Sequence, residues 1–573
     1  MKILFLTTAH NGLSQRAALE LREHGHTVEI QLATSDGAME AAVAQVRPDL
    51  IIAPFLKKAV PAAIWQKHRV LIVHPGIKGD RGPSSLDWAI MDEWQQWGVT
   101  ILQAAQGMDA GDIWASLTFP MRAVSKSTLY RHEVTQAAVQ GLLEAVEKFA
   151  SGTFIPEPLD YTSPLVKGRL HRPVKTSDRC LNWEDTTANI LKRIRAADST
   201  PGVLDTILGE RYRLFGAHEE RELSGPAGEL LATRNGAICR ATGDGAVWIT
   251  HLKREAGGIK LPATLVLGDQ LMGVAESSYD PFSPNHSCPG FRDIWYEEAE
   301  GVGYLHFDFY NGAMSTEQCQ RLQQVLVRAK LRSTKVLVLM GGHDIWSNGI
   351  HLNVIEQARS PAQESWENIN AMNDLVREII LTDTKLVIAG MQGNAGAGGA
   401  ILALAADKVY ARNGIVLNPH YKKMGGLYGS EYWTYLLPRR VGKKKALKLT
   451  EGCQPLSTAR AKAIGFLDNA FGDSVADFQY LLRQKAAALA ISLYYDSMLE
   501  QKRKERLADE LACPLEKYRE EELRQMQLNF FGEDPSYHLA RFHFVHKISC
   551  AQQPSPEALA KYPSAHKELQ QLV

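Results

Sequence analysis

The stretch Lys385–Asp407, KLVIAGMQGNAGAGGAILALAAD, decides the fold of the second half of this chain. Residues 385–390 are apolar and include β-branched side chains, which is typical of a buried strand. Residues 400–407 are rich in Ala and Leu and predict a helix. The glycines from Gly390 to Gly399 let the backbone approach a ligand and direct N–H groups at it. This strand, turn and helix N-terminus predict an anion or oxyanion pocket, although such turns also occur where they serve packing alone.

A second apolar run, residues 335–340, leads into another glycine loop that ends in Ser347-Asn348-Gly349-Ile350-His351-Leu352. Two such units can place two backbone N–H groups on one carbonyl oxygen. The loop and the turn Gly393–Gly399 resemble the Ser/Ala-Gly-x-Asp-Leu and Gly-x-x-x-Gly-Gly-Gly motifs of the crotonase (enoyl-CoA hydratase/isomerase) superfamily. The resemblance implies an acyl-CoA thioester as ligand, with its oxygen held by the N–H groups of Ile350 and Gly398.

Both glutamates that hydratases of this superfamily use are missing. Ile401 stands at the first position, and the second falls near His420-Tyr421, so we do not expect water addition to an enoyl-CoA. The polar groups that remain are Tyr421 and Glu431, and we predict that both are catalytic. The alternatives are a structural buried tyrosine and a helix N-terminal acid.

Composition limits the remaining function classes. Sixty-four basic residues balance 64 acidic ones, which gives no sign of a nucleic-acid or membrane partner. The seven cysteines are scattered, without metal-ligand spacing, as in reduced cytoplasmic proteins. No apolar run reaches the length of a signal peptide or a membrane span. We therefore expect a cytoplasmic protein of several domains.

The N-terminal segment alternates strands with helices. Residues 2–8, 28–32 and 50–54 read as strands, and Ser14 is predicted to cap a helix over residues 15–24. This order predicts a parallel sheet with helices on both faces. No G-x-G-x-x-G follows the first strand, so a dinucleotide cofactor is disfavoured.

His74 ends the next predicted strand, and Asp109 lies on a glycine loop 35 residues later, an arrangement suited to acid–base chemistry. With Arg81-Gly82-Pro83, Gly98-Val99-Thr100 and Met108–Asp112, the pair resembles the N10-formyltetrahydrofolate formyltransferase and hydrolase family. That resemblance implies that His74 and Asp109 are catalytic and that the pterin lies near residues 55–58. The family's catalytic Asn corresponds to Ile72 here. Either Asn11 or Gln15 steadies the formyl oxygen instead, or the rate is lower.

The following segments extend both resemblances. Residues 125–152 predict a long helix carrying Arg131, and residues 156–178 read as a linker. Short strands, including residues 237–241, 246–250 and 264–267, fit the small β-barrel that follows formyltransferase catalytic domains. We assign substrate binding to a set of polar side chains spread over the chain: Gln15, Arg131, Ser199, Asn311 and Arg541.

The predicted fold class is a multidomain α/β protein. It combines a Rossmann-like formyltransferase domain, a small β-barrel domain and a crotonase ββα superhelix domain with a helical C-terminal tail. The expected bounds are 1–165 for the formyltransferase-like domain, 170–268 for the barrel, 269–295 for a linker, 296–490 for the crotonase-like domain and 491–573 for the helical region.

A formyl-donor module and an acyl-CoA module in one chain point to a shared substrate, formyl-CoA. In this order, the chain is similar over its whole length to a family of [NiFe]-hydrogenase maturation factors. The similarity implies a bifunctional enzyme that transfers formyl from N10-formyltetrahydrofolate to coenzyme A and then, as a decarbonylase, releases carbon monoxide for the active-site iron. It implies no metal, and it implies other maturation proteins carrying the iron centre as partners.

Three alternatives stay open from the sequence. In the first, the acyl-CoA site in the second half of the chain, the rear site, hydrolyses formyl-CoA to formate. In the second, the formyltransferase-like site in the first half, the front site, formylates an amine, and the rear site has a separate acyl-CoA activity. The third is a non-catalytic scaffold that binds formyl-folate and coenzyme A. This alternative stays open because Ile72 and Ile401 stand where the two families carry a catalytic Asn and a catalytic Glu.

Overall fold

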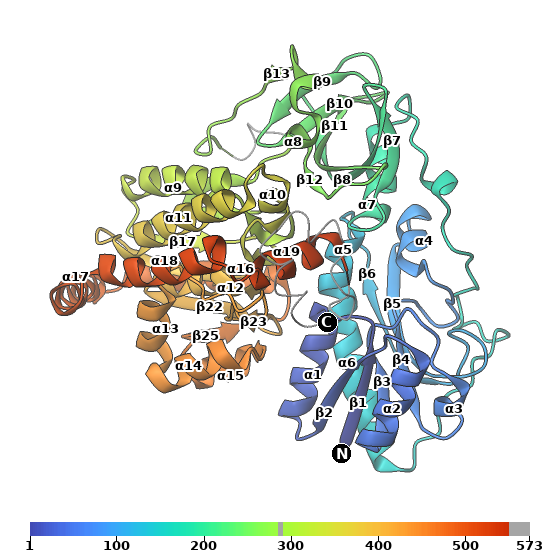
Figure 1. Cartoon of the computed structure of the whole chain (residues 1–573). Coiled ribbons are helices and arrows are strands. Elements are labelled where there is room, and N and C mark those ends of the chain that lie inside the picture. Colours follow the sequence, from blue (N-terminus) through green and yellow to red (C-terminus); the bar gives the residue numbers. More distant parts are fainter. Residues whose placement is uncertain (285–289, 549–573) are drawn as a thin grey trace. The chain divides into compact units, whose positions relative to one another are not determined.

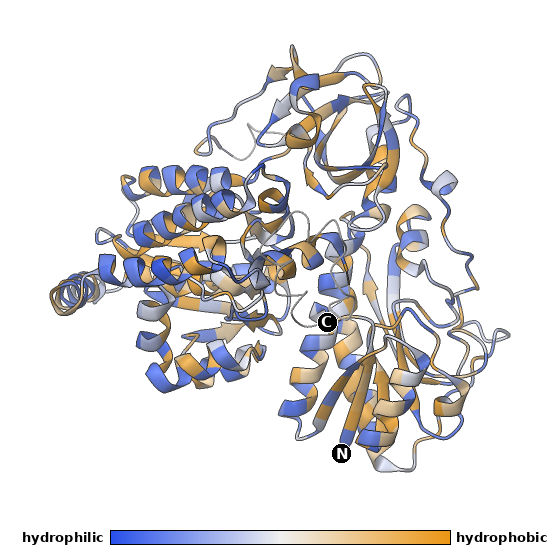
Figure 2. Ribbon diagram, viewed as in Figure 1, coloured by the Kyte–Doolittle hydropathy of each residue, from blue (hydrophilic) through white to orange (hydrophobic). Residues whose placement is uncertain are grey.

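The computed structural model describes residues 1–284 and 290–548, and these form two compact units. One unit contains residues 1–256 and 262–276, and the other contains residues 257–261 and those from 277 onward. The strands are mostly hydrophobic, whereas the helices carry both hydrophobic and hydrophilic residues (Figure 2). The predicted fold class is confirmed; the finer domain bounds stay a prediction.

The first unit begins with a six-stranded sheet in the order β2-β1-β3-β4-β5-β6 (Figure 1). The first four strands are parallel, but β5 pairs antiparallel with both β4 and β6. The predicted parallel arrangement therefore holds for β1, β2 and β3, and β5 is the strand of this sheet that runs in the opposite direction. The strands are β1 (Lys2–Thr7), β2 (Thr27–Leu32), β3 (Leu50–Ala53), β4 (Val70–His74), β5 (Gln96–Gln103) and β6 (Ile113–Pro120).

Helices cover this sheet, and one of them begins earlier than predicted. Helix α1 (Gly12–Glu23) is capped by Asn11, whose side chain accepts from the Ser14 N–H, so Ser14 is not the cap. The predicted helix over 125–152 contains α5 (Lys126–Leu129), a π-helical turn η1 (Tyr130–Val134) and α6 (Thr135–Ser151). The other helices are α2 (Asp36–Val46), α3 (Ala62–Trp65) and α4 (Ser85–Met91).

A seven-stranded sheet follows and curls around a buried interior, as a small barrel does (Figure 1). Residues 264–267, predicted as a strand, instead belong to helix α8 (Ala263–Leu267). The barrel helix α7 (Thr187–Ala197) precedes the strands β7 (Val203–Ile207), β8 (Glu210–Glu220), β9 (Leu230–Arg234), β10 (Ala237–Ala241), β11 (Ala246–Arg254), β12 (Leu261–Pro262) and β13 (Ala275–Glu276).

The second unit repeats strand, strand and helix around two sheets. Its main sheet has the order β14-β15-β17-β20-β22-β25, and every pair except β14–β15 is parallel. The strands are β14 (Ile294–Ala299), β15 (Val302–Phe307), β17 (Val336–Met340), β20 (Leu386–Met391), β22 (Lys408–Arg412) and β25 (Asn469–Phe471).

A smaller sheet of β18 (Ile345–Ser347), β21 (Asn394–Gly396), β23 (Val416–Asn418) and β24 (Leu456–Ser457) runs beside the pair β16 (Ala313–Met314) and β19 (Gly349–Ile350). The helix predicted over residues 400–407 is shorter and earlier, because α12 (Ala397–Leu402) gives way to a 3-10 turn over residues 403–405. The helices before the C-terminal region are α9 (Thr316–Lys330), α10 (Leu352–Gln357), α11 (Pro361–Ile380), α13 (Trp433–Val441), α14 (Lys443–Gly452), α15 (Thr458–Ala463) and α16 (Val475–Ala490).

The C-terminal region contains α17 (Tyr495–Ala512), α18 (Leu515–Phe531) and α19 (Ser536–His546). The rest of the predicted helical region, residues 549–573, lies outside the described residues, as do Cys288 and His286. None of the helices within the described ranges combines the length and the hydropathy needed to cross a lipid bilayer.

Candidate active sites

His74 ends β4 and is nearly buried between two carboxylates. Its Nε2 lies 2.7 Å from Oδ2 of Asp80, and its Nδ1 lies 3.5 Å from Oδ2 of Asp109. Asp109 adopts a positive φ of 50° in the loop after β5 and accepts a hydrogen bond from the Gly82 N–H at 3.2 Å. The structure therefore brings the predicted pair together and adds Asp80, a closer partner of the imidazole.

The other segments of the front motif support this group. The Thr100 hydroxyl donates to the Gly76 carbonyl at 2.8 Å, and Arg81 Nε donates to the Met108 carbonyl at 2.8 Å. Together these bonds hold the turn after His74 and join the two loops that carry Asp80 and Asp109.

The predicted substitutes for the missing Asn lie at the same edge of the sheet. Asn11 and Gln15 follow β1, which is parallel to β4 and separated from it by β3. The Asn11 amide donates to the Tyr130 hydroxyl at 3.3 Å, and the Gln15 amide donates to the His10 carbonyl. Two strand spacings, about 10 Å, separate the carboxyl ends of β1 and β4. Ile72 itself is half-buried within β4.

The π-helical turn places Arg131 beside these loops. Its neighbour Tyr130 packs edge-on against Phe55, in the loop after β3, at 6.3 Å between ring centroids. Burial raises the pKa of Tyr130 to about 12, so its hydroxyl keeps its proton. Ser199 lies in the loop after α7, and Lys126 of α5 donates to the neighbouring Thr200 carbonyl at 2.8 Å. Gln15 on α1, Arg131 on η1 and Ser199 after α7 all belong to the first unit, and their part in one substrate site stays a prediction.

In the rear site, three loops emerge at one edge of the small sheet. Strands β18, β21 and β23 are parallel neighbours, so their carboxyl ends carry Ile350, Gly398 and His420 to the same side. Gly349 has φ of 77°, and a Cβ placed on it would lie 3.3 Å from the Gly398 nitrogen. Gly398 is near the start of α12, where N–H groups have no partner within the helix. The two predicted donors therefore belong to backbones in contact.

Glu431 and Tyr421 meet against this turn. The Tyr421 hydroxyl donates to Glu431 Oε2 at 2.8 Å, and the Ser430 N–H donates to the same oxygen at 3.2 Å. The carboxyl lies directly over Gly398, because a Cβ on that glycine would fall closer than 3.0 Å to Glu431 Oε1. Both side chains are buried.

Burial dominates the electrostatics of the pair. It raises the pKa of Glu431 to about 7, although the donors Tyr421 and Ser430 act in the opposite direction. Burial, with the nearby charge of Glu431, raises the pKa of Tyr421 well above its usual value. A carboxyl that titrates near neutrality beside a protonated phenol is suited to accept and return a proton.

Comparison with known proteins gives the chain its family. Three family models match: Formyl transferase over residues 1–146, Formyl transferase, C-terminal domain, over residues 173–266, and Enoyl-CoA hydratase/isomerase over residues 297–535. The hydrogenase maturation factor HoxX of Bradyrhizobium diazoefficiens is 47% identical over 97% of this chain and 96% of its own length. The chain belongs to the HypX/HoxX family of hydrogenase maturation factors.

Solved structures of the HypX/HoxX family agree with this. HypX from Aquifex aeolicus, in complex with tetrahydrofolic acid, is 46% identical and superposes with a TM-score of 0.93 over 97% of both chains. A methionyl-tRNA formyltransferase of Roseiflexus castenholzii is 29% identical over 40% of this chain and 72% of its own length. The predicted family, with a formyltransferase front and a crotonase-like rear, is thus confirmed.

Glu522 of α18 is a rear-site residue of this HypX/HoxX chain that sequence reasoning missed. Its fully buried carboxylate accepts from the N–H groups of Tyr432 at 2.9 Å and Thr434 at 2.8 Å, and from the Ser430 hydroxyl at 3.2 Å. Burial raises its pKa to about 8. Glu431 and Tyr432 both have positive φ, so Glu522 holds a backbone segment that L residues rarely adopt.

A second missed residue, Asn373 of α11, supports the same segment. Its Oδ1 accepts from the Glu431 N–H at 2.8 Å and lies 3.0 Å from the Ser430 hydroxyl oxygen. Neither Glu522 nor Asn373 follows a strand end or a glycine loop, so no local signal marks them.

The remaining predicted binding residues lie in different settings. The Asn311 carbonyl accepts from the Asn348 side chain at 2.9 Å, which ties it to the loop carrying Ile350. Arg541 is fully buried in α19, where its Nε lies 2.9 Å from Oε2 of Glu356. A substrate role for Asn311 and Arg541 stays a prediction.

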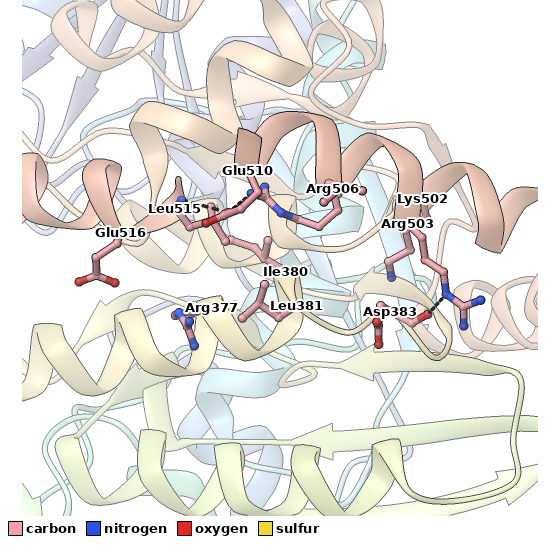
Figure 3. Close-up of a pocket in the computed structure, with 11 residues that line it drawn as sticks. Arg377, Ile380, Leu381, Asp383, Lys502, Arg503, Arg506, Glu510, Leu515 and Glu516 are labelled. Atoms are coloured by element: carbon pink, nitrogen blue, oxygen red, sulfur yellow. Dashed lines mark hydrogen bonds and ion pairs between the residues drawn. The ribbon is translucent and has the colours of Figure 1, made fainter. Parts of the chain in front are cut away.

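A cavity of about 300 Å³ lies in the second unit between α11, α17 and α18, and neither Glu431 nor Tyr421 lines it (Figure 3). Several of its charged side chains already have partners. Arg506 pairs with Glu510, and Arg503 donates to the Asp383 carbonyl at 2.9 Å. We therefore assign the chemistry to the two described groups rather than to this cavity.

Proposed function

We propose that this chain makes the carbon monoxide ligand of the [NiFe]-hydrogenase iron in two steps. At the front site, formyl passes from N10-formyltetrahydrofolate to the thiol of coenzyme A. At the rear site, formyl-CoA is decarbonylated to carbon monoxide and coenzyme A. The folate in the Aquifex aeolicus relative supports the first substrate, and the enoyl-CoA hydratase/isomerase match supports the second.

At the front, His74 takes the thiol proton while the sulfur attacks the formyl carbon. The C–N10 bond then breaks, and the proton passes to N10 as tetrahydrofolate leaves. Asp109, 3.5 Å from the imidazole, stabilises the positive charge that His74 carries in between. Gln15, Arg131 and Ser199 bind the substrates at the surrounding loops.

At the rear, the N–H groups of Ile350 and Gly398 hold the formyl oxygen. The Glu431 carboxylate takes the formyl proton, the C–H electron pair stays on carbon, and the C–S bond breaks toward sulfur. Carbon monoxide leaves, and Glu431 returns the proton to the thiolate. The observation that carries this proposal is the buried Glu431–Tyr421 pair lying over Gly398. An oxyanion donor of this kind is worth about 100- to 1000-fold in rate.

The test follows the formyl carbon. The full chain is incubated with formyltetrahydrofolate labelled in that carbon and with coenzyme A, and carbon monoxide is trapped by a haem protein. We expect label in carbon monoxide and one tetrahydrofolate per label released. Label only in formate would show hydrolysis, a formylated amine would show another acceptor, and no turnover would favour a scaffold.

A further inference from the structure

The predicted linker over residues 156–178 is built into the front site. The Gly168 N–H donates to the Lys78 carbonyl at 2.9 Å, and the Arg81 N–H donates to the Arg169 carbonyl at 3.1 Å. The His171 N–H donates back to the Arg81 carbonyl at 2.9 Å. A Cβ on Gly82 or on Gly168 would fall closer than 3.0 Å to the facing backbone. The linker therefore lies directly on the loop that carries Asp80.

His171 reaches Asp80 from this linker. Its Nε2 lies 3.6 Å from Asp80 Oδ1, and its ring stacks on Trp88 at 5.8 Å between centroids. Asp80 has no exposed side-chain surface, and its Oδ1 accepts no hydrogen bond from the described residues. A carboxylate buried this deeply is costly unless neighbouring groups compensate its charge. His74 and His171 are the groups that face it.

The two carboxylates beside His74 are not equivalent. Asp80 Oδ2 is within hydrogen-bond distance of Nε2, whereas Asp109 Oδ2 is 3.5 Å from Nδ1 and accepts the Gly82 N–H instead. A carboxylate that accepts one imidazole N–H fixes the tautomer and leaves the other nitrogen as the base. Gly76 permits this contact, because a Cβ there would fall closer than 3.0 Å to both paired atoms.

We propose that Asp80 is the positioning residue of the front site. It holds His74 with its proton on Nε2, so that Nδ1, facing Asp109, accepts the thiol proton. His171 faces Asp80 Oδ1 from the linker and helps to hold that carboxyl group in place. This assignment rests on the proposed function only in taking His74 as the acid–base group.

The tautomer is read directly in the full chain by two-bond ¹H–¹⁵N correlation spectra after ¹⁵N labelling of histidine, with His74 assigned from H74Q. We expect the Nε2–H form in the wild type and the Nδ1–H form in D80N. Formyl-folate turnover, measured as tetrahydrofolate release, should fall about 100- to 10,000-fold in D80N, with the folate KM changed less than threefold. H171N should lower turnover about tenfold and D92N, on the surface beside Arg169, should leave it unchanged.

G76A gives an independent disruption of the same contact and should also change the tautomer. An unchanged His74 tautomer in both D80N and G76A, or wild-type turnover in D80N, would overturn the assignment. The spectra need no acceptor, so they decide it even if coenzyme A proves not to receive the formyl group.

Discussion

In the proposed rear reaction, the Glu431 carboxyl acts first as the base and then as the acid. Because burial raises its pKa from 4.5 to about 7, the folded chain holds this proton more tightly than the unfolded chain. Its contribution to stability is therefore intact below pH 4.5 and is lost, by about 3 kcal/mol, as pH rises through 7. The fraction of Glu431 in the carboxylate form, which acts as the base, increases as pH rises over the same range.

Carbon monoxide release from formyl-CoA should accordingly rise about tenfold between pH 6 and pH 8. The measurement is the initial rate trapped by a haem protein at fixed ionic strength. E431Q should be inactive at every pH, and its unfolding free energy should vary less with pH than that of the wild type. A flat wild-type profile would contradict the role of Glu431 as base.

Tyr421 acts on the carboxylate through one hydrogen bond of 2.8 Å. Y421F removes that donor without changing the shape of the ring, so it should lower carbon monoxide release at least about 100-fold while tetrahydrofolate release continues. Y480F, at an exposed tyrosine of α16, is the matched control. Equal loss of both products in Y421F would contradict separate sites.

Single residues could be predicted where a strand end or a glycine loop marks them. This holds for His74 and Asp109, and for Tyr421 and Glu431, each of which the structure brings together. Asp80 directly precedes the Arg81-Gly82-Pro83 motif, but nothing local shows that its side chain turns back to His74. Long-range partners such as Glu522, about 90 residues from the segment it holds, leave no sequence pattern at all.

At the scale of elements, the turn into α12 depends on the absence of a side chain at Gly398. G398A would place a Cβ closer than 3.0 Å to Glu431 Oε1 and displace the carboxyl from the oxyanion donors. We expect carbon monoxide release to fall at least about 100-fold, with tetrahydrofolate release retained. G452A is the control, since nothing lies within 4 Å of its Cβ. Wild-type decarbonylation by G398A would rule out this geometry.

Helix α18 supports the rear site through Glu522. E522Q keeps one acceptor oxygen but leaves a buried donor from residues 430–434 unpaired, which costs about 1 to 3 kcal/mol. Denaturant unfolding should show this loss, and carbon monoxide release should fall more than about tenfold as Glu431 shifts. E521Q changes the neighbouring exposed acid and should alter neither quantity. If E522Q matched E521Q, α18 would have no part in the site.

The position and type of an element could be predicted from the sequence better than the direction in which a strand runs in its sheet. Apolar runs located β1, β4, β17 and β20 to within a residue or two. The nine residues between β5 and β6 are too short for a parallel crossover, which normally needs a dozen or more. The link from β4 to β5 contains a helix, so its length gives no sign that β5 runs antiparallel.

At the scale of the whole molecule, the order of modules carried the prediction furthest. Motifs in each half implied two enzyme families, and their combination implied the HypX/HoxX family that the comparison confirms. In the proposed function, formyl-CoA is the product of one half and the substrate of the other. The activity of the second half should therefore be measurable without that of the first when formyl-CoA is supplied directly.

The most direct test gives formyl-CoA, without folate, to the wild type, H74Q and E431Q. We expect the wild type and H74Q to release carbon monoxide at similar rates, and E431Q to release none. With formyltetrahydrofolate and coenzyme A instead, only the wild type should complete the sequence. The proposed two-step function would be contradicted if the wild type released no carbon monoxide from formyl-CoA. It would also be contradicted if H74Q and E431Q lost carbon monoxide release to the same extent.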